Sequence, residues 1–134
     1  MKHIFILLSV MVASVTFSFA QNNVPIPDAP ANTIVAFDNA SGPNINTDDL
    51  KKMTMVVVFQ QDYEVVNFCM IIMSEGKGVA PINLVSKDNK LTKEQLAALQ
   101  NCARGDRVAL EPVIVKKKGT DKLLHAHGAM YSIM

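Results

Sequence analysis

The sequence lacks the short motifs that commonly carry catalysis. It contains no H-E-x-x-H pair, no Cys-x-x-Cys pair, no serine in a nucleophile-elbow pattern and no glycine loop framed for phosphate or dinucleotide binding. These absences argue against metal-assisted, acyl-transfer and nucleotide-dependent reactions. We therefore expect a protein that is not an enzyme, with no catalytic residue, no cofactor and no metal site.

An excess of charge of one sign is also lacking. Lys, Arg, Asp and Glu together make up 19% of the sequence, and no basic cluster stands out. Once Lys2 is removed with the N-terminal segment discussed below, 12 basic and 12 acidic residues remain. Because basic patches are what attract polyanions, we expect no binding to nucleic acid or to an anionic lipid surface.

Cysteine is scarce as well, since Cys69 and Cys102 are the only two. Cys69 lies in a predicted strand and Cys102 at the end of a predicted helix, so packing of the helix on the sheet could bring the thiols together. A disulfide would close a loop of about 30 residues and stabilise the fold by roughly 3–4 kcal/mol. Free thiols are the alternative, because unpaired cysteine is a common small core residue. The sequence leaves both open.

The N-terminus has the features of an export signal. A basic start is followed by an apolar run, and small residues stand at Ser18 and Ala20. This order is typical of a secretory signal peptide and predicts that residues 1–20 are cleaved off between Ala20 and Gln21. The alternative is a retained membrane anchor, but several polar residues interrupt the apolar run. We expect a periplasmic or secreted protein with no stable membrane insertion after cleavage.

The remaining 114 residues fit one domain behind a short leader. Residues 21–33 are a proline-rich leader, and this composition favours an extended chain without ladder hydrogen bonds. Residues 34–134 form the predicted β-rich domain. Runs with strand composition occur at residues 33–37, 55–59, 65–73, 80–85, 107–117 and 123–133.

Two helices are expected among these strands. The clearer one spans residues 91–100, where Thr92 is suited to cap the helix, Gln95 to close a capping box and Gly105 to stop it. A helix of one or two turns is expected earlier, after Asn46 or Thr47 as its cap. The pattern predicts a mainly β, α+β fold with one or two short helices, arranged as a single antiparallel β-sandwich-like domain.

For one of these strands the sequence also predicts its position in the fold. Residues 65–73 are apolar at nearly every position, on both alternating faces. Such a strand is expected at the centre of a sandwich or in a sheet covered by a helix.

Two small motifs suggest binding sites but have simpler explanations. His125 and His127 alternate along a predicted strand, yet a zinc site needs further ligands that the flanking sequence does not supply. A solvated histidine pair is therefore expected. Arg104-Gly105-Asp106 spells an adhesion tripeptide, but it falls where a turn must follow the helix, so we expect a surface turn.

Several short stretches after Glu64 keep a recognisable order and spacing: Val65-Val66-Asn67-Phe68, Leu91-Thr92-Lys93-Glu94-Gln95, Arg104-Gly105-Asp106-Arg107-Val108, Glu111 and Gly119-Thr120. Over about 70 residues the sequence thereby resembles the C-terminal domain of GldM, the periplasmic protein of gliding motility and type IX secretion in Bacteroidetes. Ala109 and Pro112 depart from that family's pattern, and its membrane helix and long coil have no counterpart in this sequence.

The resemblance implies a freestanding, exported β-sandwich-like module that binds a protein partner in the cell envelope. The implied role is non-catalytic and accessory to type IX secretion or gliding machinery. The alternative is a secreted domain, unrelated to secretion machinery, that binds a small ligand or a host surface.

Overall fold

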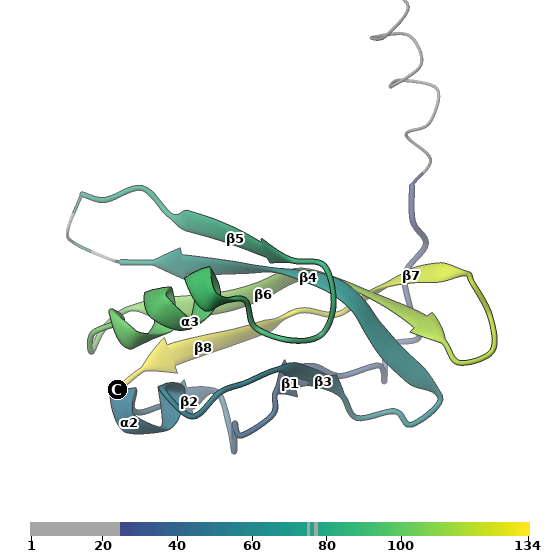
Figure 1. Ribbon diagram of the computed structural model, residues 1–134, viewed down its shortest axis with the longest axis horizontal. Coiled ribbons are helices and arrows are strands. Elements are labelled where there is room, and N and C mark those ends of the chain that lie inside the picture. Colours follow the sequence, from purple (N-terminus) through teal and green to yellow (C-terminus); the bar gives the residue numbers. More distant parts are fainter. Residues whose placement is uncertain (1–24, 75, 77) are drawn as a thin grey trace, which may run out of the picture.

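The computed structural model describes residues 25–74, 76 and 78–134 (Figure 1). The strands are β1 (Val35–Phe37), β2 (Asn44–Ile45), β3 (Val56–Val58), β4 (Tyr63–Met73), β5 (Ile82–Ser86), β6 (Arg107–Lys117), β7 (Leu123–Ala126) and β8 (Ala129–Ile133). The helices are α2 (Thr47–Leu50) and α3 (Lys93–Gln100). The predicted mainly β, α+β, sandwich-like fold is confirmed.

A six-stranded sheet with the strand order β2-β8-β6-β4-β5 forms the centre of the domain. β6 is long enough to pair with two strands on one edge: residues 107–110 pair with β8 and residues 113–116 with β7. β6 runs antiparallel to β4, β7 and β8, and β5 runs antiparallel to β4. In contrast, β2 runs parallel to β8. β1 and β3 form a separate antiparallel sheet.

One face of the six-stranded sheet holds the hydrophobic core. Because side chains alternate along a strand, the core residues of β4 and β6 share this face: Phe68, Met70, Ile72, Val108, Leu110, Val113 and Val115. Leu99 from α3 and Phe37 and Val56 from the small sheet join the same core. Figure 1 shows α3 in front of the central strands and β1 and β3 along one side of them. The helix and the small sheet thus cover this face, and β4 has the central, helix-covered position that its sequence predicts.

The predicted capping box at the start of α3 is confirmed. The Thr92 hydroxyl accepts a hydrogen bond from the Gln95 backbone N–H at 3.1 Å, and the Gln95 side chain accepts one from the Thr92 N–H at 3.0 Å. The prediction that Gly105 stops this helix is wrong. The helix ends at Gln100, and Gly105, with φ of +96°, instead serves the turn before β6.

Replacing Thr92 by alanine is expected to lower the free energy of unfolding by about 1 kcal/mol, because the Gln95 N–H loses its capping partner. The urea midpoint of unfolding measures the effect. Thr92→Ser is the matched control: it keeps the hydroxyl and should unfold close to wild type. Equal midpoints for Thr92→Ala and wild type would contradict the assigned cap.

The second half of the predicted leader is part of the folded domain. The Pro27 carbonyl accepts a hydrogen bond from the His125 N–H at 2.8 Å, and the Ala29 N–H donates to the His125 carbonyl at 2.6 Å. Ala29 and Thr33 are buried. The expectation of no ladder bonds is therefore wrong at this point, because proline removes only its own N–H and leaves the carbonyl and the neighbouring amides available.

The closing strand differs from the prediction in one respect. Residues 123–133 were expected as one strand, but the chain is divided into β7 and β8 around Gly128. Gly128 lies so close to β6 that a Cβ atom would overlap the Leu110 carbonyl oxygen. The two-residue strand β2 was not predicted, because a pair of residues carries no periodic pattern.

The signal peptide predicted for residues 1–20, with its cleavage site between Ala20 and Gln21, lies outside the described residues. Among the residues that are described, no helix is long and apolar enough to cross a membrane.

Candidate functional site

The edge of the six-stranded sheet is interrupted beside β8. The residues before β3 meet this edge in parallel first at Asp28, opposite His125 of β7. Two further parallel contacts flank the gap: Ile34 lies opposite His127, and β2 pairs with the end of β8. Between these contacts, the nine residues 35–43 lie opposite only the four residues 128–131. The surplus residues leave the edge to form β1 and the turn after it, and a gap opens beside β8.

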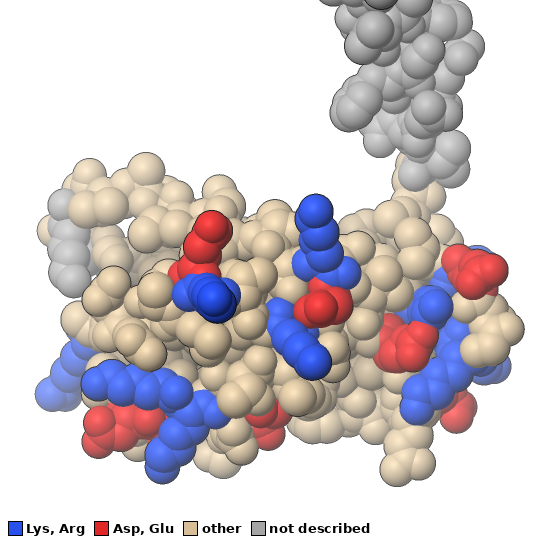
Figure 2. Space-filling view, viewed as in Figure 1, with Lys and Arg blue, Asp and Glu red and all other residues tan. Residues whose placement is uncertain are grey.

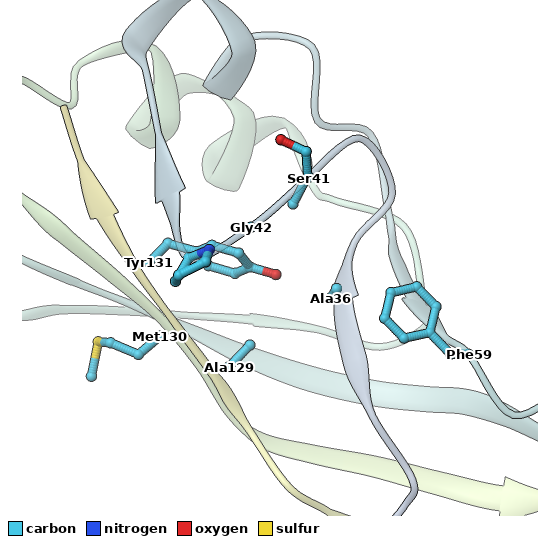
Figure 3. A pocket seen from close by; sticks show the side chains of 9 residues that line it. Ala36, Ser41, Gly42, Phe59, Ala129, Met130 and Tyr131 are labelled. Atoms are coloured by element: carbon cyan, nitrogen blue, oxygen red, sulfur yellow. The ribbon is translucent and has the colours of Figure 1, made fainter.

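A pocket of about 270 Å³ occupies this gap (Figure 3). In Figure 3, Tyr131 and Ala129 of β8 point into the gap, Ala36 lies across from them on β1, and the Met130 side chain points away. Phe59, from the chain just after β3, stands beyond β1. The lining residues are Ala36, Ala40, Ser41, Gly42, Pro43, Phe59, Ala129, Met130 and Tyr131.

Tyr131 connects the two sheets at the bottom of the pocket. Its side chain is buried, and its hydroxyl accepts a hydrogen bond from the Phe37 backbone N–H at 3.0 Å. The ring also packs on the Phe37 ring, with 5.1 Å between the ring centroids. Burial raises the pKa of the Tyr131 hydroxyl, although the Phe37 N–H acts in the opposite direction. The hydroxyl is therefore neutral at physiological pH and is occupied in a structural bond.

The chemistry of the pocket is apolar and uncharged. No Asp, Glu, Lys, Arg, His or Cys is among its lining residues, and Tyr131 is the only ionisable group. Phe59 and Met130 are exposed at its rim, with 60% and 51% of their surfaces accessible. Such a surface suits the burial of apolar groups far better than proton transfer, for which a titrating group near neutral pH is needed.

Backbone groups of β8 also face the gap. The Ile133 N–H donates to the Asp106 carbonyl at 2.9 Å, on the β6 side, whereas the Ser132 N–H donates to the Pro43 carbonyl at 2.8 Å, on the opposite side. Successive residues of a strand direct their backbone groups to opposite sides. The N–H and C=O of Met130 therefore face the gap, where, among the described residues, β2 no longer pairs with β8.

A second apolar surface lies on the face of the sheet opposite the core, here called the open face. Strand alternation and register place eight apolar side chains on it: Cys69, Ile71, Met73, Val85, Ala109, Ile114, Leu123 and Met130. Val85 and Met130 are the most exposed of these, and Ala109 and Ile114 are buried between their neighbours. Met130 belongs to both surfaces, since its side chain lies on the open face and its backbone faces the pocket.

The two cysteines lie on opposite sides of the sheet. Cys69 alternates with the core residues Phe68 and Met70 and therefore points to the open face, whereas Cys102 is a member of the core. They form no disulfide with each other in the structure, and Cys69 is only partly buried. Partial burial raises the pKa of the Cys69 thiol, despite an opposing backbone hydrogen bond from Leu84.

A thiol count without reductant should find two reactive thiols per unfolded chain. In the folded protein, Cys69 should react with an aromatic disulfide reagent before Cys102, because Cys102 is buried. Cys69→Ser should remove the faster phase and leave the slower one. A count of zero thiols would show that the cysteines are bonded and that the sheet does not separate them.

The histidines and the adhesion tripeptide form no evident site. His125 pairs with Ile114 on the open face, and no group of three or more His, Cys, Asp or Glu in the described part of the chain is placed to hold a metal. Asp106 is buried, and its carboxylate accepts the Ala103 N–H at 2.9 Å. The expected turn is present, but the expected surface position of Asp106 is wrong, so the tripeptide is not displayed as an adhesion motif.

Comparison of the sequence with models of known protein families gives no match, and comparison with curated proteins gives none either. The class that the structure defines is a small, mainly β domain with an apolar, uncharged pocket at a sheet edge. The pocket and the adjoining surfaces are therefore the candidate functional site.

Proposed function

We propose that the mature chain is an exported, non-catalytic module that binds a protein partner in the cell envelope. One observation supports this most directly: an apolar pocket opens at an interrupted sheet edge, with exposed Phe59 and Met130 at its rim. Aromatic residues and methionine are enriched in protein interfaces, and charged residues are depleted at interface centres. The pocket has this composition.

The continuity of two apolar surfaces favours a protein over a small ligand. Met130 joins the pocket to the open face, where Val85, also exposed, extends the apolar surface toward the far edge of the sheet. A volume of about 270 Å³ is at or below the lower end for small-molecule pockets, roughly 300–1,000 Å³. A macromolecular partner can cover both surfaces at once.

The distribution of charge is consistent with a neutral partner surface. Figure 2 shows basic and acidic side chains interspersed over the face that carries α3, without a large region of one sign. The ion pair between Lys116 and Glu64, at 3.2 Å, places both signs side by side near the β7 end of the sheet. We therefore propose no role in binding nucleic acid.

The resemblance to the C-terminal domain of GldM supports a more specific role, accessory to type IX secretion or gliding machinery. In this proposal the chain is exported by its N-terminal signal and meets its partner in the periplasm or outside the cell. The alternative is a secreted domain, unrelated to secretion, that binds a small ligand or a host surface.

Site-specific photo-crosslinking in an export-competent Bacteroidetes strain tests the proposal. A photoreactive amino acid replaces Phe59 or Met130 in the full chain, and a third variant carries it at Glu94, which is exposed on α3. Illumination of intact cells should join the two rim positions to a discrete envelope protein, identified by mass spectrometry. The Glu94 position should give background only, because it lies away from the pocket.

The crosslinking products distinguish the proposed binding function from the proposed secretion role. Only background products at Phe59 and Met130 would reject the binding function at this site, as would equal products at all three positions. A specific partner outside the secretion and gliding machinery would retain the binding module and reject the secretion role.

A further inference from the structure

The gap beside β8 has the features of an unfilled strand position. On one side, the N–H and C=O of Met130 point into it. On the other side, β1 pairs with β3 through its far edge and presents its near edge to the gap, where the Phe37 N–H is bonded to Tyr131. The two contacts of the N-terminal chain with the β8 edge close the gap at both ends.

We infer that this gap receives a short, extended, uncharged segment of the partner protein, which pairs with β8 at Met130. The inference rests on the proposed protein-binding function and names the ligand that the pocket would take. The segment would continue the edge of the six-stranded sheet between the contact at Ile34 and the contact at β2.

The backbone groups of β8 that face the gap favour an extended polypeptide as the ligand. An unpaired strand edge offers alternating donors and acceptors, which an added strand satisfies with its own backbone. The four residues 128–131 of the open edge correspond to about 13 Å of extended chain. A segment of about four residues therefore spans the available edge.

The residues that line the pocket limit which side chains the segment can carry. Since no charged group lines the pocket, a charged side chain would be buried there without a partner at a high cost in free energy. Side chains of a strand point alternately to its two faces. One apolar side chain would therefore enter the pocket beside Tyr131 and Ala129, and its neighbours would point outward toward the open face and Phe59.

Two substitutions remove the site in different ways. Met130→Pro removes the N–H that faces the gap, and an edge strand tolerates proline where its N–H does not serve the ladder. Ala129→Met places a larger side chain in the gap into which Ala129 points (Figure 3). Met130→Ala is the reference for Met130→Pro, because both remove the Met130 side chain and only the alanine variant keeps the backbone N–H.

The probe is a displayed library of random hexapeptides, selected for binding to the mature chain. Selected peptides should be uncharged at their centre. They should bind Ala129→Met at least about tenfold more weakly than wild type, and Met130→Pro at least about tenfold more weakly than Met130→Ala. N-methylation of successive peptide amides should abolish binding at alternate positions only, which is the pattern of strand pairing.

Amide hydrogen exchange provides a readout that does not depend on the variants folding. The Met130 amide should exchange quickly in the free protein and at least about tenfold more slowly with the selected peptide bound. The Ile133 amide, already bonded to Asp106, should change little.

The outcomes separate this inference from the proposed function. Failure to select any peptide would overturn the inference, as would equal binding to wild type and Ala129→Met or an unprotected Met130 amide in the complex. If envelope crosslinks from Phe59 persist in Met130→Pro and Ala129→Met, the module still binds a protein but does so without strand addition.

Discussion

Replacing Gly128 by alanine is expected to lower the free energy of unfolding by about 3 kcal/mol, near the upper end for overpacked sites. An alanine Cβ at this position would overlap the Leu110 carbonyl oxygen and crowd the Glu111 side chain. The carbonyl belongs to β6, which pairs with β4, β7 and β8, so it cannot move without distorting the centre of the sheet. Urea denaturation followed by circular dichroism measures the loss.

Gly42→Ala is the matched control for Gly128→Ala. A Cβ atom on Gly42 meets nothing within 4 Å, and its φ does not require glycine. The variant should therefore unfold within about 0.5 kcal/mol of wild type. A Gly128→Ala protein as stable as Gly42→Ala would mean that β7 and β8 do not approach β6 as closely as the structure shows.

Most of the regular elements could be predicted because their signals are local. Residues 107–117 were predicted as a strand and form β6 with the same bounds. The capping box of Thr92 and Gln95 depends on residues three apart, so the start of α3 can be read from the sequence. The stop at Gly105 was misplaced because a glycine with positive φ serves a turn as well as a helix end.

The candidate site could not be predicted, because distant contacts create it. The gap depends on Ile34 meeting His127, and the pocket depends on Tyr131 bonding to Phe37, 94 residues earlier in the chain. Its lining consists of ordinary strand and turn residues, and none of these residue types indicates a pocket on its own. The separation of Cys69 from Cys102 likewise depends on which face of β4 packs into the core. Because both faces of this strand are apolar, the sequence does not show which one it is.

Replacing Gln95 by alanine is expected to destabilise the fold by about 3 kcal/mol, considerably more than the loss of its capping partner Thr92. Gln95 is fully buried, and its side chain makes two hydrogen bonds. Its oxygen accepts the Thr92 N–H, and its amide nitrogen donates to the Leu84 carbonyl of β5 at 2.9 Å. The substitution removes the partner of the Thr92 N–H and of the Leu84 carbonyl, which are partly buried, and opens a cavity between α3 and the sheet.

Gln100→Ala is the control, since Gln100 has the same side chain and lies exposed at the end of the same helix. Its midpoint in urea should match wild type to within about 0.5 kcal/mol. Because β5 is an edge strand held by β4 alone in the sheet, loss of the Gln95 bond should also speed hydrogen exchange in β5 more than in β6. A uniform change in exchange along both strands would show that Gln95 stabilises the helix end but does not anchor β5 to α3.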